Sequence, residues 1–304
     1  MSWFWLSVLA LICWSGSDLF SKIGCRDRDD KYSHLKMVVA VGVVMGIHAA
    51  VEVFVQGVEI NFQIILTYLP VSLLYILSMG IGYFGLRYIE LSVSSPICNS
   101  SGALVAILTI ITAGLRSING WQLGATALVC IGVVGLGIVE MREDEEARAA
   151  RQSISNYKYA KSLIAILIPV IYCVLDAAGT FADSLVLETL DEDSANVAYE
   201  LTFLAMGALC LIVLLAKRER FLPRREGPKY VGAVFETAGQ LAYIYALADS
   251  EHVAMSAPII SAYCMASVVW SRIFLKEKLS WKHYVMICIA VAGIVVLGLF
   301  DELG

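Results

Sequence analysis

Five acidic residues lie inside long apolar segments of this chain: Asp18, Glu52, Asp176, Glu200 and Glu236. An ionisable side chain inside a membrane is costly, so each of them needs a partner or a function. Asp176 and Glu236 lie about seven residues, roughly 10 Å, inside their segments, too deep for a short side chain to reach the polar surface. We predict that one or both line a water-filled cavity, and the alternative is a buried structural hydrogen bond.

Polar and aromatic residues extend the helical faces that carry these two acids. Tyr172 precedes Asp176 by four residues, and Gln240 and Tyr243 follow Glu236 by four and seven. Residues at these spacings share one face of a helix. An aromatic ring attracts a cation by about 0.5–2 kcal/mol, and a buried carboxylate supplies the counter-charge. Because no Lys or Arg lies comparably deep, the pattern favours a cationic or zwitterionic amine over an anion as the ligand.

The predicted ligand-binding set adds deep residues of other apolar segments to these two faces. Trp and Tyr near the ends of segments are more typical of the membrane interface, so they are left out of the set. The predicted residues are Trp14, Tyr83, Asn99, Tyr172, Asp176, Glu236, Gln240, Tyr243 and Tyr263.

A second group of residues could exchange protons. His48 and Glu52 are four residues apart, and a His beside a carboxylate changes charge near neutral pH. A purely structural pair is the alternative. With Glu200, which lies near the outer end of its own segment, these residues are the proton-coupling candidates. Asp18 is expected to form an ion pair with Lys22, four residues later, near the membrane surface.

The composition is that of a membrane protein. The chain has 304 residues, of which 59% are hydrophobic and 16% charged, and its mean hydropathy is +0.75. A soluble protein would carry roughly 25% charged residues. Ten stretches of about 20 mostly apolar residues are long enough to span a bilayer. They run approximately over 2–22, 35–56, 64–86, 91–114, 120–139, 162–182, 195–216, 229–248, 252–274 and 281–300.

The distribution of basic residues predicts the orientation of these spans. Of the 22 Lys and Arg residues, all except Arg116 lie in the loops that follow odd-numbered spans. Basic loops stay in the cytoplasm, so we expect both termini to be extracytoplasmic in a multi-pass protein of the cytoplasmic membrane. The first span follows Met1 without a basic leader or a small-residue cleavage site, and we therefore expect a retained helix.

The second half of the sequence repeats the first at a displacement of about 161 residues. The matching pairs are Phe20 and Phe181, Met45 and Met206, Ser94-x-Pro96 and Ser256-x-Pro258, and Trp121 and Trp281. Five spans per copy is an odd number, so the second copy must be inverted in the membrane, as in secondary transporters. We predict an all-α membrane protein of ten transmembrane helices in two inverted five-helix repeats, 1–139 and 162–304, joined by a polar cytoplasmic linker at 140–161.

Several of these motifs resemble the drug/metabolite transporter superfamily, in particular its ten-span EamA-type branch. The resemblance covers nearly the whole chain, although 116–121 lacks the acidic residue of the family turn that 275–281 carries. The motifs are Trp14–Lys22, Ser94-Ser95-Pro96, Ser256-Ala257-Pro258, Leu275–Trp281 and Ala292-Gly293. The resemblance implies alternating access around a cavity lined by spans 1–4 and 6–9, with spans 5 and 10 peripheral and often at a homodimer contact.

The expected function is therefore secondary active transport of a small metabolite or drug-like molecule, with proton-coupled export as the finer hypothesis. An ATP-binding Gly-x-x-x-x-Gly-Lys-Ser/Thr loop does not occur in the sequence. An intramembrane aspartic protease is the alternative enzyme, but its Tyr-Asp and Gly-x-Gly-Asp patterns do not occur either, and a structural membrane protein is the third alternative. The eight cysteines form no Cys-x-x-Cys pair, so their spacing does not indicate a metal site. We expect no metal, no cofactor and no nucleic-acid partner.

Overall fold

The structure, a computed structural model, describes residues 2–25, 27, 29–89, 91–113, 119–141, 164–276 and 279–303. All regular elements in these ranges are helices, which confirms the predicted all-α class. Except for residues 140 and 141, the predicted linker lies outside the described residues. The elements are α1 (Trp3–Cys25), α2 (Ser33–Val51), η1 (Glu52–Gln56), α3 (Phe62–Tyr88), α4 (Leu91–Cys98), α5 (Ser101–Ala113), α6 (Gly120–Met141), α8 (Ile164–Val186), α9 (Glu192–Ala216), α10 (Pro223–Leu247), α11 (Val253–Ser261), α12 (Tyr263–Trp270), η3 (Ser271–Leu275) and α13 (Trp281–Leu303).

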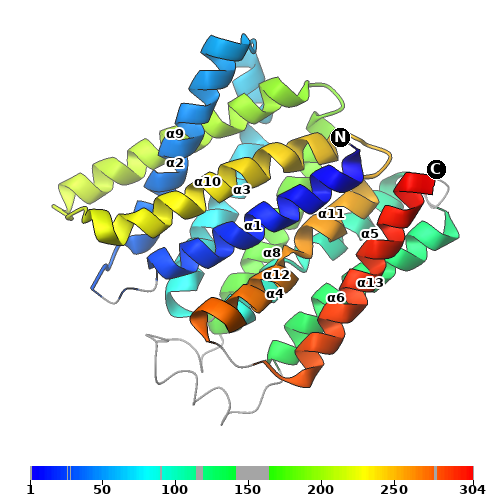
Figure 1. The fold of residues 1–304 in the computed structure, drawn as a ribbon. Helices are drawn as coiled ribbons and strands as arrows, with labels where there is room; N and C mark the ends of the chain where they lie inside the picture. The colour runs from blue at the N-terminus through cyan, green and yellow to red at the C-terminus, as the bar shows by residue number, and fades with distance from the viewer. Residues whose placement is uncertain are drawn as a thin grey trace.

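The helices are long enough to cross a membrane. Within the described ranges, nine helical stretches are both long and apolar enough to do so. The tenth, α10, has 25 residues, but its first turns carry charges, among them Arg224, Glu226 and Lys229. The start of α1 and the end of α13 lie at the same end of the bundle, as an even number of spans requires (Figure 1).

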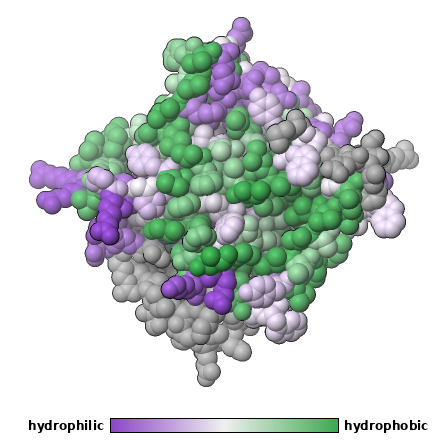
Figure 2. All heavy atoms as spheres, viewed as in Figure 1, coloured by the Kyte–Doolittle hydropathy of each residue, from purple (hydrophilic) through white to green (hydrophobic). Residues whose placement is uncertain are grey.

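The outer surface is apolar where lipid would cover it. Large hydrophobic side chains such as Phe54, Ile111 and Ile47 are more than half exposed. Figure 2 shows hydrophobic residues over the middle of one face, with hydrophilic residues gathered chiefly toward its left and top. Together with the length of the helices, this surface defines a multi-pass membrane protein.

The most extensive helix contacts join the two halves of the chain. Helix α1 packs along α10, α2 along α9, α3 along α8, and α6 along α13 (Figure 1). In the sequence repeat, α1 corresponds to α8, α2 to α9, α3 to α10 and α6 to α13. The pair α1–α10 therefore corresponds to the pair α8–α3, and the pairs α2–α9 and α6–α13 each correspond to themselves. The contacts are therefore those of a two-fold arrangement. Inversion of the copies in a membrane stays a prediction.

Two spans are interrupted at equivalent places. The fourth span breaks into α4 and α5 at Asn99 and Ser100, and the ninth breaks into α11 and α12 at Ala262. Asn99 Nδ2 donates to Ser95 O at 2.8 Å, and Ser100 Oγ donates to Pro96 O at 3.0 Å. These side chains compete with the backbone for carbonyls, which favours a break. Each break follows a proline of the repeated Ser-x-Pro motif by a few residues.

Candidate functional site: a central cavity lined by acids and aromatic rings

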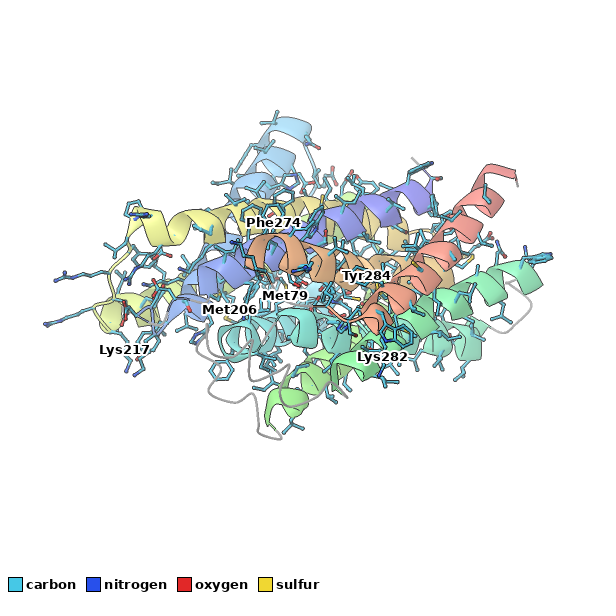
Figure 3. The ribbon with its side chains drawn as sticks, turned by 60° about the horizontal axis from the view of Figure 1, so that its bottom comes forward. Met79, Met206, Lys217, Phe274, Lys282 and Tyr284 are labelled. Carbon is cyan, nitrogen blue, oxygen red and sulfur yellow. The ribbon has the colours of Figure 1, made fainter. Side chains whose placement is uncertain are left out.

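A cavity lies at the two interrupted spans, between the halves of the chain. Its empty volume is about 920 Å³, a figure that includes space open to solvent. Met79 on α3 lines it and lies in the middle of the bundle in Figure 3, whereas Lys217 lies at one end. Residues of α1, α3, α4, α5, α8, α9, α10, α11 and α12 line the cavity, whereas α6 and α13 contribute none of the described lining residues.

All nine residues of the predicted ligand-binding set line this one cavity. They reach it from five helices (α1, α3, α8, α10 and α12) and from the break after α4, and sequence periodicity alone could not predict that these elements meet. Their role in binding a substrate stays a prediction, because a shared cavity does not identify its ligand.

Three carboxylates face the cavity, and each accepts a hydrogen bond from serine. Ser101 Oγ donates to Asp176 at 2.7 Å, and Ser17 Oγ donates to Glu236 at 2.7 Å. Both bonds cross between the halves of the chain. Among the lining residues that the structure describes, none is Lys or Arg. The described lining of the cavity therefore holds more negative than positive side chains, and the hydrogen bonds that these acids accept within it come from hydroxyl groups.

The third carboxylate, Asp18, shows that the predicted ion pair with Lys22 is wrong. Asp18 Oδ2 accepts from Ser95 Oγ at 2.6 Å and from Ser267 Oγ at 2.8 Å. The ammonium group of Lys22 instead donates to the carbonyl of Leu86 at 2.6 Å and to that of Ile89 at 2.7 Å. Spacing of four residues placed both side chains on the same side of α1, but neighbouring helices offered each a closer partner.

Aromatic rings form much of the cavity wall. The ring of Trp14 lies 4.9 Å from that of Tyr243 and 5.8 Å from that of Tyr263, measured between centroids. Trp14 Nε1, Tyr83 Oη and Gln240 Nε2 are buried polar atoms without a hydrogen-bond partner in the structure. Such atoms are rare in folded proteins. Their position around one cavity equips it for a ligand with both polar groups and a flat or cationic part.

A group of hydroxyls lies behind the cavity around Asp183, which the sequence reasoning missed. Tyr68 Oη donates to Asp183 Oδ1 at 2.7 Å, and Tyr75 Oη donates to Oδ2 at 3.4 Å. Tyr75 is also hydrogen-bonded to Tyr243, and both line the cavity, whereas Tyr68 and Asp183 are fully buried. The expected span ended at residue 182, one residue too early. Its spacing of seven from Asp176 was the signal that could have identified it.

The proton-coupling candidates form a separate cluster between α2 and α9. His48 Nδ1 lies 2.9 Å from Glu200 Oε1 and 3.6 Å from Glu52 Oε2. His48 is therefore closer to Glu200, which belongs to the other half of the chain, than to Glu52, four residues along the same helix. None of the three residues lines the cavity. Their coupling role stays a prediction.

Buried basic residues do occur, but outside the cavity, near the ends of helices. Lys229 in α10 is fully buried and forms ion pairs of 3.0 Å with both Asp30 and Glu226. Lys36 in α2 pairs with the same Asp30 at 2.8 Å. Although burial raises the pKa of Asp30, the hydrogen bonds and charges of the two lysines outweigh burial and lower the pKa below its usual value.

The fold defines a helical, multi-pass membrane protein, and the two halves of the chain enclose an internal cavity. Residues 163–299 match the EamA-like transporter family, and the resemblance predicted from the motifs is thereby confirmed for the second half of the chain. This match indicates a membrane transporter of small molecules and is consistent with a protein that is not an enzyme.

The architecture as a whole is similar to that of a solved structure. A chain described only as "Crystal structure of protein" superposes with a TM-score of 0.64 at 14% sequence identity, over 98% of this chain and 96% of that one. At this identity the likeness concerns the fold alone. No curated protein matches the sequence.

Proposed function

We propose that this protein is a secondary transporter that exports a small cationic or zwitterionic amine across the cytoplasmic membrane in exchange for protons. The observation that carries the proposal is the charge of the cavity: Asp18, Asp176 and Glu236 face it, and no described lining residue is basic. A buried charge without a counter-charge is costly. A cation or a proton therefore relieves that cost, whereas an anion adds to it.

The aromatic wall supports the same substrate class. The rings of Tyr243 and Tyr263 each lie within 6 Å of the ring of Trp14, and each ring face attracts a cation by about 0.5–2 kcal/mol. The unpartnered Tyr83 Oη and Gln240 Nε2 could hydrogen-bond a polar group of the same ligand. Amine and aromatic recognition can thus occur in one site.

Competition between substrate and proton would couple their movements. A carboxylate that holds the amine must release its proton, and binding of a proton expels the amine. If the site opens alternately to the two sides, protons entering from outside exchange for amine leaving the cell. The equivalent breaks at Asn99–Ser100 and Ala262 support the alternation, because interrupted helices are typical of substrate sites between transporter repeats.

The orientation follows from the basic loops. The loops after odd-numbered spans would be cytoplasmic, both termini extracytoplasmic, and the repeats inverted. The ion-paired Asp30, Lys36 and Lys229 would then lie near the cytoplasmic surface, and the His48–Glu52–Glu200 cluster nearer the outside.

The test is transport by the purified protein in proteoliposomes with an imposed pH gradient. Aromatic quaternary amines and the matched aromatic carboxylates serve as probes, and the change in tryptophan fluorescence that is lost in a Trp14→Phe variant reports binding. We expect saturable binding and gradient-driven movement of the amines only. Glu236→Gln and Asp176→Asn keep the side-chain shape and should reduce both at least tenfold, whereas Glu188→Gln, an exposed control, should not. Binding of the carboxylates alone, or unchanged transport in both variants, would overturn the proposal.

A further inference from the structure

The cluster between α2 and α9 has the make-up of a metal site. His48 supplies a ring nitrogen, and Glu52 and Glu200 supply carboxylates, with one ligand atom of each lying within 4.8 Å of the others. Both glutamates are buried, and the side chain of His48 is 29% exposed. The ligands come from both helices, and His48 and Glu200 are 152 positions apart, so the i,i+4 spacing of His48 and Glu52 indicated only one side of the site.

A fourth group points to a ligand independently of these charges. Asn196 is fully buried, and its Nδ2 donates to Glu52 Oε2 at 3.0 Å. The amide group is therefore directed into the cluster, yet its Oδ1 has no hydrogen-bond partner in the structure. A buried carbonyl oxygen without a partner is unusual. In this orientation the amide nitrogen faces Glu52, and rotating the amide by half a turn would direct Oδ1 toward a cation bound between the carboxylates.

The charge of the cluster favours a doubly charged ion. With both carboxylates ionised and His48 neutral, the group would carry a charge of about −2, and a protonated imidazole would still leave one carboxylate uncompensated. Charges in a membrane interior are retained only when they are paired or bind a metal. A divalent cation neutralises the group completely without protonating either Glu52 or Glu200.

The donor separations fit such an ion. Metal–ligand bonds of about 2.0–2.2 Å place neighbouring ligand atoms roughly 3.0–3.4 Å apart. His48 Nδ1 lies 2.9 Å from Glu200 Oε1 and 3.1 Å from Oε2, and 3.6 Å from Glu52 Oε2. These three distances bracket the required value, so small side-chain movements would complete the coordination.

The backbone on both sides of the cluster is held in place by close packing. A Cβ atom on Gly42 of α2 would lie 2.7 Å from Phe203 O and 3.1 Å from Gly207 Cα, so the two helices touch backbone to backbone. At Glu52, α2 continues into the wider π-helical turn η1, a local form that is frequent at functional sites. The ligands are thus carried by rigid elements, as precise coordination requires.

We infer that His48, Glu52, Glu200 and Asn196 form a binding site for a divalent transition-metal ion of the zinc type, which would join α2 of the first half to α9 of the second. Imidazole nitrogen with carboxylate oxygen suits zinc and its neighbours, whereas magnesium and calcium prefer oxygen ligands alone. The site lies apart from the cavity, and its test requires no transport measurement.

The test is a titration of Zn²⁺ into metal-free purified protein in detergent, in competition with a chromogenic chelator. We expect one ion per chain. Glu200→Gln and His48→Ala should each weaken binding at least tenfold, and Asn196→Leu less strongly. The control is Asp249→Asn, because His252 Nδ1 and Asp249 form an ordinary pair at 2.8 Å and its loss should leave the titration unchanged.

X-ray absorption at the zinc edge decides the ligand set without any variant. The expected spectrum has only nitrogen and oxygen neighbours, including one imidazole. Absence of saturable binding to the wild-type protein, undiminished binding by folded Glu200→Gln protein, or equal displacement by Mg²⁺ would each overturn the inference.

Discussion

Replacing Asp30 by Asn should destabilise the protein much more than the same change three residues earlier. Asp30 lies in the loop between α1 and α2, where its side chain is 1% exposed. Its two oxygens contact Lys36 at 2.8 Å and Lys229 at 3.0 Å. Removal of its charge leaves two buried ammonium groups that share one remaining carboxylate, Glu226.

The magnitude follows from those contacts. Removing one partner of a buried ion pair costs about 3–5 kcal/mol. Here Glu226 stays 3.6 Å from Lys36 and 3.0 Å from Lys229, and the new amide oxygen still accepts one hydrogen bond. We therefore expect about 2–3 kcal/mol, below the full range.

Asp27→Asn is the matched control. Asp27 pairs with Arg225 at 3.0 Å in the same region, but the two side chains are 35% and 36% exposed. Exposed pairs contribute about 0–1 kcal/mol. The assay is reversible unfolding of both variants and the parent in mixed micelles with increasing denaturing detergent. Equal losses of unfolding free energy in the two variants would refute the reasoning that burial determines how much this ion-pair network contributes to stability.

The pH dependence gives a second readout of the same network. Because the pKa of Asp30 is lowered in the folded protein, its contribution is complete above the unfolded pKa of about 4 and is lost as the pH falls through the folded-state pKa. The stability difference between parent and Asp30→Asn should therefore shrink in acid. A difference that grows on acidification would contradict the sign of the shift.

Three further changes test the packing and the topology. Gly42→Leu should prevent folding, because the new side chain would meet the backbone of α9. Gly124→Leu is the control and should fold, because nothing lies within 4 Å of the position of its Cβ atom. Size-exclusion profiles compare the yields of the two variants, and equal profiles would argue against the close contact of α2 and α9. Tyr243→Phe removes the hydrogen bond to Tyr75 beside Asp183 and should cost about 1 kcal/mol in the same unfolding assay, with no change expected for Tyr284→Phe, an exposed residue. On a background without reactive native cysteines, an impermeant thiol reagent should label Val58→Cys but not Glu219→Cys in intact cells, and the reverse pattern would invert the topology.

Much of the fold could be predicted because membrane insertion depends on local composition. Apolar length and the basic loops do not depend on tertiary contacts, and the ten expected stretches correspond to the ten helical units. Depth within a span was enough to select Asp176 and Glu236 as cavity residues. Periodicity in the sequence predicts which face of a helix a residue lies on, but it does not predict which other helix packs against that face. The contacts of Ser267 with Asp18 and of His48 with Glu200 therefore could not be predicted.

Errors of the sequence reasoning arose at the ends and interruptions of helices. Asp183 was excluded because the expected span ended one residue before it, while α8 continues to Val186. Asn99 was predicted to bind the ligand, which is untested, but it was not predicted to be the place where its span breaks. Helix ends are set by individual hydrogen bonds, such as that from Asn99 to Ser95, and these are weaker signals than hydrophobicity.

Pairing of each helix with one from the opposite half has a consequence for biosynthesis. The ribosome completes α1 about 200 residues before its main partner α10, and at roughly 5–20 residues per second this interval lasts ten seconds or more. During that time Ser17 and Asp18 lack Glu236 and Ser267, the groups that later contact them. The nascent first half must therefore be sheltered, by the insertion machinery or by a chaperone, until the second half emerges. Expressed separately, neither half should accumulate, whereas their co-expression could restore the protein.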